Sequence, residues 1–160
     1  KRTEQFWLMR ESITYASARD GPQVKHDISI PISKIPQFVD KVSKKISNLF
    51  PCTRIINFGH LGDGNLHFNV APPDSLGNGL DEEHRKKAFK KYLLEYEDKI
   101  RRCVHDEVIL HEGSISAEHG LGQLRKNEAA RLKSSVELKM MKKIKKIFDP
   151  SNIMNPGKVL

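Results

Sequence analysis

The amino-acid sequence predicts an α+β fold in which helices pack on one side of a largely antiparallel sheet. Long segments carry apolar residues at helical spacing, and shorter segments with strand-like patterns lie between them. Glycine and proline mark the boundaries of these segments. The expected order is α-β-α-β-β-α-β-α-α in one domain, because no repeat, low-complexity tract or linker divides the 160 residues.

The first three elements are expected to be a helix, a strand and a second helix. Residues 3–18 have a helical pattern, which Asp20-Gly21-Pro22 would end. The buried side of this helix should carry Phe6, Trp7 and Ile13. Residues 24–30 alternate in polarity, which indicates a strand. The second helix should open at Ser33 and end before Pro51, since its apolar residues recur at helical spacing.

A hairpin is predicted from residues 53–60 and 65–70, with Asp63-Gly64 as its turn. Asp-Gly suits a type I′ turn, because both central residues need positive φ. In a two-residue turn of this kind, His60 would face His67 on the same side of the sheet. Their Cβ atoms would then be about 4.5–5.5 Å apart, so two imidazoles could share one divalent cation.

The remaining elements follow from caps and helix periodicity. A loop over residues 71–80 precedes a helix over 82–106, which Asp81 can cap. The inner face of that helix should carry Phe89, Leu93, Tyr96, Ile100 and Val104. Residues 113–117 are small and extended, and they complete βαββαβ elements of the ferredoxin-like kind.

Two more helices should end the chain. A short helix is expected near residues 127–132. Ser134 and Glu137 have the spacing of a capping box for the last helix, which should stop at Asp149-Pro150.

The net charge of +8 comes mainly from two helical segments, around residues 85–91 and 139–146. A nucleic-acid site would need stacking aromatics among these cations, but Tyr92 and Tyr96 fall on the apolar positions of a helix. Solvated helix faces are the simpler interpretation, and a positive field that attracts small anions is an alternative. We therefore expect no nucleic-acid partner. No apolar run approaches the ~18 residues of a membrane span.

Cysteines and the start of the chain give two further expectations. Cys52 and Cys103 form no CxxC motif and should be reduced thiols. The sequence begins with Lys1-Arg2, with no methionine and no signal-like segment. We expect a piece of a longer protein.

A metal site is one interpretation of His60 and His67. Imidazoles are common zinc ligands, and a carboxylate from Glu118 would complete a catalytic set of three. Glu118 lies among Gly, Ser and Ala residues, which let the backbone approach a ligand. The alternative is a pair of structural histidines. Asp63 is better explained as a turn residue than as a ligand.

Other side chains could bind or activate an anionic substrate. His119 follows Glu118 and could remove a proton near neutral pH, or it could be a structural imidazole at a helix start. Arg10 and Thr14 share one helix face and could grip a carboxylate, which Lys25 could also reach. The alternative for Arg10 is a surface ion pair with Glu11 or Asp27.

Five stretches of the sequence resemble one known family. They are residues 10–14 (RESIT), 25–31 (KHDISIP), 59–69 (GHLGDGNLHFN), 113–120 (GSISAEHG) and 148–160 (FDPSNIMNPGKVL). Together they are similar to the C-terminal domain of FAD-linked D-2-hydroxyacid dehydrogenases, which are flavoproteins of the vanillyl-alcohol-oxidase type. Within that family the chain resembles D-2-hydroxyglutarate dehydrogenases and mitochondrial-type D-lactate dehydrogenases.

The resemblance implies that the cofactor and the substrate are bound mainly by different domains. FAD would sit in a separate N-terminal domain that these 160 residues lack, and residues 1–160 would be the C-terminal substrate or cap domain. Arg10, Thr14, Lys25 and Asn69 match substrate-binding positions. His60, His67 and Glu118 match the ligands of a divalent metal, usually zinc. His119 matches the base that takes the hydroxyl proton while hydride passes from C2 to the flavin.

The resemblance also implies partners and a location. A small 2-hydroxy acid would be the substrate, and the protein's own FAD domain would be its covalent partner. Mitochondria would be its compartment, with the cytoplasm as the alternative. The isolated fragment should not turn over. The rival interpretation is a protein-interaction module on the same fold, for example one associated with actin.

Overall fold

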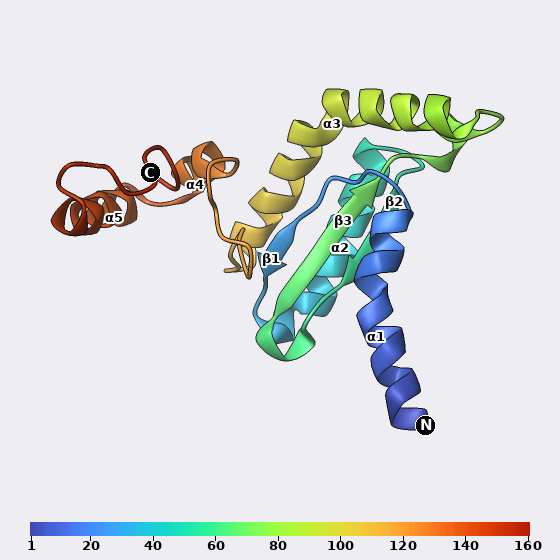
Figure 1. The fold of residues 1–160 in the computed structure, drawn as a ribbon, viewed down its shortest axis with the longest axis horizontal. Coiled ribbons are helices and arrows are strands. Elements are labelled where there is room, and N and C mark those ends of the chain that lie inside the picture. Colours follow the sequence, from blue (N-terminus) through green and yellow to red (C-terminus); the bar gives the residue numbers. More distant parts are fainter. The chain divides into compact units, whose positions relative to one another are not determined.

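The computed structural model describes residues 1–160, which form two compact units, Lys1–Ala117 and Glu118–Leu160. The first unit is built on a three-stranded antiparallel sheet, which confirms the predicted α+β class (Figure 1). Its strands are β1 (Asp27–Ser29), β2 (Arg54–Phe58) and β3 (Asn65–Ala71). The order β1-β3-β2 places β3 in the centre.

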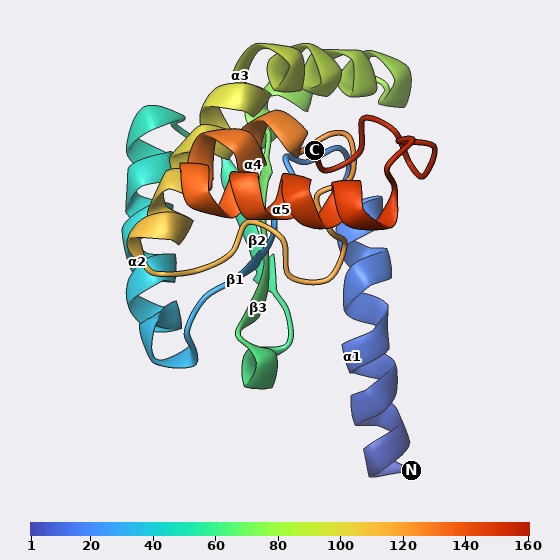
Figure 2. The same cartoon turned by 90° about the vertical axis from the view of Figure 1, so that its left-hand side faces the viewer.

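Helix α2 (Ile35–Leu49) covers one face of this sheet, as Figures 1 and 2 both show. Leu66, Phe68 and Val70 alternate along β3 and are buried, so they lie on the face toward α2. The rings of Phe38 and Phe68 meet edge to face, with centroids 5.8 Å apart. The apolar stripe predicted for the second helix is therefore confirmed.

Helix α3 (Glu82–Leu110) also contributes buried residues to the core. Asp81 caps it as predicted, because its carboxylate accepts a hydrogen bond from the His84 backbone N–H. Three of the five predicted inner residues are buried and Leu93 and Tyr96 are half-buried. The helix runs four residues beyond the predicted end, since buried Val108 continues the apolar pattern.

Four other histidines have structural or surface positions. His26 and His105 are buried and meet edge to face, with ring centroids 5.5 Å apart. His111 is buried against Phe38. His84 is exposed and contacts Asp81. The two cysteines are free thiols, with Cys52 exposed and Cys103 buried.

The fourth strand of the predicted βαββαβ elements is reduced to a single bridge. Ser29 and Ser114 exchange two backbone hydrogen bonds of 2.9 Å, and the Ala117 N–H donates to the Asp27 carbonyl at 3.2 Å. The segment 113–117 therefore follows β1 without continuing as a strand.

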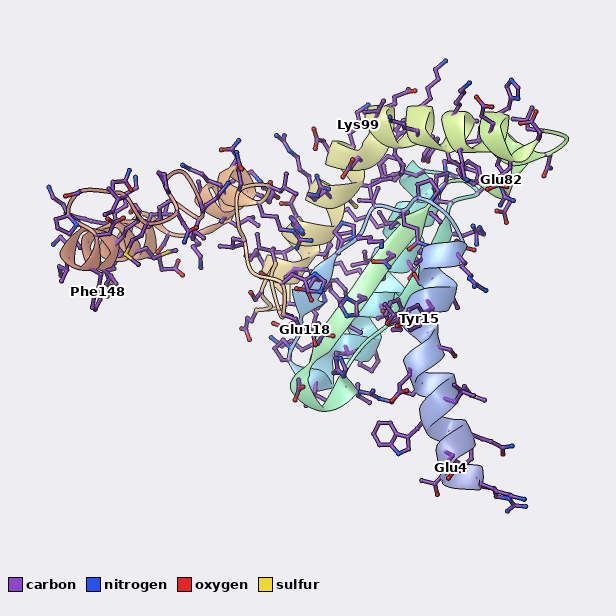
Figure 3. All side chains as sticks on the ribbon, viewed as in Figure 1. Glu4, Tyr15, Glu82, Lys99, Glu118 and Phe148 are labelled. Carbon is purple, nitrogen blue, oxygen red and sulfur yellow. The ribbon has the colours of Figure 1, made fainter.

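Helix α1 (Arg2–Arg19) forms where predicted, but its predicted burial is wrong. Phe6 and Trp7 are 68% and 54% exposed, and Ser17 is the one buried residue of the helix. Figures 1 and 2 show α1 running away from the sheet, so nothing in the first unit covers its N-terminal half. Side chains project around it from Glu4 onward (Figure 3).

The second unit contains α4 (Lys126–Leu132) and α5 (Ser135–Phe148). The predicted capping box is confirmed, since Ser134 and Glu137 each accept a hydrogen bond from the backbone of the other. At the other end, beside Phe148 (Figure 3), Asp149 accepts hydrogen bonds from Lys145 and from the Ile153 and Met154 backbones. Asp149 thus fixes the chain after α5.

None of the helices in this chain combines the length and apolar character that crossing a membrane requires.

Candidate metal and substrate site

The sheet face opposite α2 carries polar residues, and we call it the polar face. Alternation along β3 places Asn65, His67 and Asn69 there, because Phe68 points toward α2. Asp27 of β1 is the Cα partner of His67 and therefore projects from the same face. All but His67 are buried, and His67 is 17% exposed. Buried polar side chains are uncommon, so this face is a candidate site.

The predicted two-residue hairpin is wrong, and with it the direct pairing of His60 with His67. The Cα partner of His67 is Phe58, whose ring centroid lies 4.9 Å from that of the imidazole. Residues Leu61–Asp63 form a 3-10 turn, and Gly64 alone in the loop has positive φ, at 71°. A type I′ turn would need positive φ at Asp63 as well.

A close backbone contact explains the longer loop. A Cβ atom on Gly59 would lie 2.3 Å from the Asn65 carbonyl oxygen. The backbone at Gly59 therefore approaches the backbone at Asn65 more closely than a residue with a side chain would allow. The Asp63 and Gly64 N–H groups then donate back to the carbonyls of His60 and Leu61, at 3.0 and 3.1 Å. These turns close the loop over residues 59–64.

His60 lies in this loop, half-buried, next to Arg10 of α1. Arg10 Nη2 is 3.3 Å from His60 Nδ1. Because a guanidinium can only donate, Nδ1 is the acceptor and Nε2 of the neutral ring carries the hydrogen. For His60 to ligate a cation, this contact must open.

His67 lies beside a buried carboxylate. Nδ1 of His67 is 3.9 Å from Oδ1 of Asp27, whose side chain is 2% exposed. The Asn65 side-chain amide donates to the same Oδ1 at 3.0 Å. A histidine ligand usually directs its other ring nitrogen at a carboxylate or carbonyl, so this pair fits a metal-ligating His67.

Sequence reasoning missed Asp27 and Asn65 as site residues. The sequence alone suggests Asp27 only as a surface partner of Arg10. The signal that could have identified it is the register of β1 on β3, which sets Asp27 opposite His67. That register depends on pairing across forty residues and has no local signature.

Asn69, a predicted substrate contact, holds the chain before β1 against the sheet. Its Nδ2 donates to Gln23 Oε1 at 3.1 Å, and its Oδ1 accepts from the His26 backbone N–H at 3.4 Å. Thr14 and Lys25 are exposed. Thr14 follows Arg10 by one helical turn, as predicted.

Glu118 and His119 are the first residues of the second unit, in an exposed and irregular segment (Figure 3). Gly120, which follows them, has φ of 74°. Their convergence with His60 and His67 stays a prediction.

Comparison with known proteins gives consistent matches. A family model described as "FAD linked oxidases, C-terminal domain" matches residues 1–159. The chain is 35% identical over 159 residues to a D-2-hydroxyglutarate dehydrogenase of Stutzerimonas stutzeri, covering 99% of the chain and 32% of that protein. It is 36% identical to the mitochondrial D-2-hydroxyglutarate dehydrogenase of Arabidopsis thaliana, covering 99% of the chain and 25% of the relative.

The rat mitochondrial D-2-hydroxyglutarate dehydrogenase is 33% identical, over 100% of this chain and 26% of its own length. The chain thus spans about a quarter to a third of the length of these relatives.

Proposed function

Because the chain belongs to the family of FAD linked oxidase C-terminal domains, we propose that it is the substrate- and metal-binding part of an FAD-dependent D-2-hydroxyacid dehydrogenase. The observation that carries the proposal is the match over 99–100% of the chain to relatives named D-2-hydroxyglutarate dehydrogenase. D-2-hydroxyglutarate, or D-lactate, would be oxidised to the 2-oxo acid, with hydride passing to FAD.

The remainder of the protein would bind most of the FAD. The relatives are three to four times longer than the segment that they share with this chain, which leaves room for a flavin domain. FAD supplies the hydride acceptor, and this chain would hold and orient the 2-hydroxy acid.

A divalent metal, with zinc the best candidate, would be held by His60, His67 and Glu118. Two imidazoles and a carboxylate form a common catalytic zinc set with an open position for substrate oxygens. The buried Asp27 carboxylate beside His67 supports this assignment. When bound, the metal lowers the pKa of the substrate hydroxyl.

Arg10 would bind the carboxylate of the substrate, with Thr14 and Lys25 as further donors. A 2-hydroxy acid carries its hydroxyl and its carboxylate on adjacent carbons. The 3.3 Å contact between Arg10 and His60 sets an anion-binding guanidinium beside a proposed metal ligand, which suits such a ligand.

Two roles complete the proposed site. His119 would accept the hydroxyl proton, because an imidazole titrates near neutral pH. Asn69 lies two residues after His67 on the polar face and would contact the substrate from there.

Mitochondria are the proposed location, since the Arabidopsis and rat relatives carry that word in their names and the Stutzerimonas relative does not. The actin-associated alternative gains no support from any of these relatives, whose names are those of enzymes.

The test is anaerobic flavin reduction by the full-length protein. D-2-hydroxyglutarate, D-lactate and their L enantiomers are added separately, and flavin absorbance is followed. We expect one of the two D acids to bleach the flavin rapidly and neither L acid to do so. A flavin-loaded protein that no D-2-hydroxy acid reduces would refute the proposal.

A further inference from the structure

Asp27 and His67 are a cross-strand pair on the polar face. They are Cα partners in the β1–β3 register, so their side chains leave the sheet on the same side, next to each other. The carboxylate Oδ1 and the imidazole Nδ1 are 3.9 Å apart. This separation is longer than a hydrogen bond, whose donor and acceptor lie about 2.7–3.2 Å apart.

Burial makes this carboxylate unusual. Asp27 is 2% exposed and Asn65 is 2% exposed, and burying a carboxylate is costly unless hydrogen bonds compensate it. Asn65 Nδ2 supplies one such bond to Oδ1 at 3.0 Å. Two apolar side chains of similar size would fill the same space at a lower cost in free energy. The presence of a buried carboxylate here therefore points to a role for its charge.

Asn65 also forms a hydrogen bond with the backbone of His60, the other histidine proposed to bind the metal. Asn65 Oδ1 accepts a hydrogen bond from the His60 backbone N–H at 3.4 Å. One amide therefore connects the loop that carries His60 with the carboxylate that faces His67. Its two ends cannot shift independently, because the side chain is planar and buried.

We propose that Asp27 and Asn65 are positioning residues that hold the two proposed metal-binding histidines. Asp27 keeps the hydrogen of the His67 ring on Nδ1, which leaves the lone pair of Nε2 for a cation. Asn65 fixes the Asp27 carboxylate and the start of the His60 loop in one arrangement. This inference rests on the proposed function, since it assigns the histidines to a metal.

The experiment uses the full-length protein and two pairs of variants. Asp27→Asn keeps an acceptor for Asn65 but removes the charge, and Asp40→Asn is its control, because Asp40 is exposed on α2 and pairs with Lys44. Asn65→Ala is matched by Asn57→Ala, since Asn57 is an exposed residue of β2. His67→Ala is added as the reference for loss of a ligand.

Two quantities are measured. Nitrogen-15 NMR of labelled histidine reports which ring nitrogen of His67 is protonated in the metal-free protein. Competition with a chromogenic chelator reports zinc affinity. We expect Asp27→Asn and Asn65→Ala to bind zinc roughly 10–100-fold more weakly. We expect Asp27→Asn to shift the His67 tautomer, while both controls match the parent protein.

An unchanged tautomer and unchanged zinc affinity in Asp27→Asn, with zinc binding lost in His67→Ala, would overturn the positioning role and leave the proposed function standing. If His67→Ala binds zinc like the parent, the metal assignment fails instead. In that case a shifted tautomer in Asp27→Asn would show that Asp27 orients the His67 ring, but its proposed role toward a metal would fall with the metal assignment.

Discussion

Arg10 and His60 are fifty positions apart in the sequence, and Nη2 of one lies 3.3 Å from Nδ1 of the other. The residue proposed to bind the substrate carboxylate therefore occupies a ring nitrogen of a proposed metal ligand. Cation binding by that nitrogen and the contact with Arg10 exclude each other. Substrate would resolve this competition by giving Arg10 an anionic partner.

Replacing Arg10 should separate substrate binding from metal binding. Arg10→Ala in the full-length protein removes charge-assisted hydrogen bonds worth about 1.5–3 kcal/mol, so we expect the KM for the 2-hydroxy acid to rise roughly 10–100-fold. Zinc affinity without substrate should rise, because the competing guanidinium is gone. Steady-state kinetics and chelator competition measure the two effects.

Arg19→Ala is the control for this change, since Arg19 is an exposed residue at the end of the same helix. An Arg10→Ala protein with the KM of the Arg19→Ala protein would show that Arg10 does not bind substrate.

Gly59 and Gly62 of the His60 loop provide a test substitution and its matched control. A Cβ on Gly59 would lie 2.3 Å from the Asn65 carbonyl, whereas nothing lies within 4 Å of a Cβ on Gly62. Gly59→Ala should therefore force the His60 loop away from β3 and lower both Tm and zinc affinity. Gly62→Ala should leave both unchanged. Equal Tm values for the two variants would contradict the close approach described for Gly59.

Local signals in the sequence predicted the helices well. The Ser134–Glu137 capping box and the Asp81 cap were correct because each depends on residues within one helical turn. The spacing of Phe38, Val42 and Ile46 predicted the buried stripe of α2 for the same reason.

Features set by distant residues were not predictable in this way. The Asp63-Gly64 dipeptide favoured a tight turn, but the approach of Gly59 to Asn65 decided the register. The burial of α1 was predicted from its apolar residues alone, although burial needs a partner surface. The roles proposed for Asp27 and Asn65 depend on β1 pairing with β3, which no local pattern encodes.

The ion pairs between α2 and α3 should give a pH-dependent stability. Burial raises the pKa of the Glu107 carboxyl, but hydrogen bonds from Lys41 and Lys45 outweigh burial and hold that pKa below its usual range. A lowered folded-state pKa stabilises the fold above the unfolded-state pKa, and this contribution is lost as the pH falls through the folded-state value.

Glu107→Gln should therefore lower the free energy of unfolding by about 1–3 kcal/mol at neutral pH. The difference from the parent should shrink in acid, where the parent carboxyl is also neutral. Denaturant unfolding at a series of pH values measures it. Glu83→Gln, which alters an exposed pair with Lys87, should change stability by less than about 0.5 kcal/mol. A pH-independent difference for Glu107→Gln would contradict the ionic explanation.

The 160-residue chain by itself should be unable to turn over. We expect no flavin absorbance after purification and no dye-linked oxidation of D-2-hydroxyglutarate or D-lactate, because the hydride acceptor would be bound by the rest of the protein. Absorbance spectra and a dye-reduction assay measure this. A substantial oxidation rate from the chain alone would show that the flavin site had been assigned to the wrong part.

Metal removal tests the central claim, that the polar face and its loop form a metal-dependent 2-hydroxyacid site. The full-length protein is stripped with a chelator, its flavin content is checked, and D-2-hydroxyacid oxidation is measured before and after zinc is returned. We predict a loss of at least about 100-fold with flavin retained, and recovery on adding zinc to the parent but not to His67→Ala. An oxidation rate that is unchanged in the stripped protein would contradict the account.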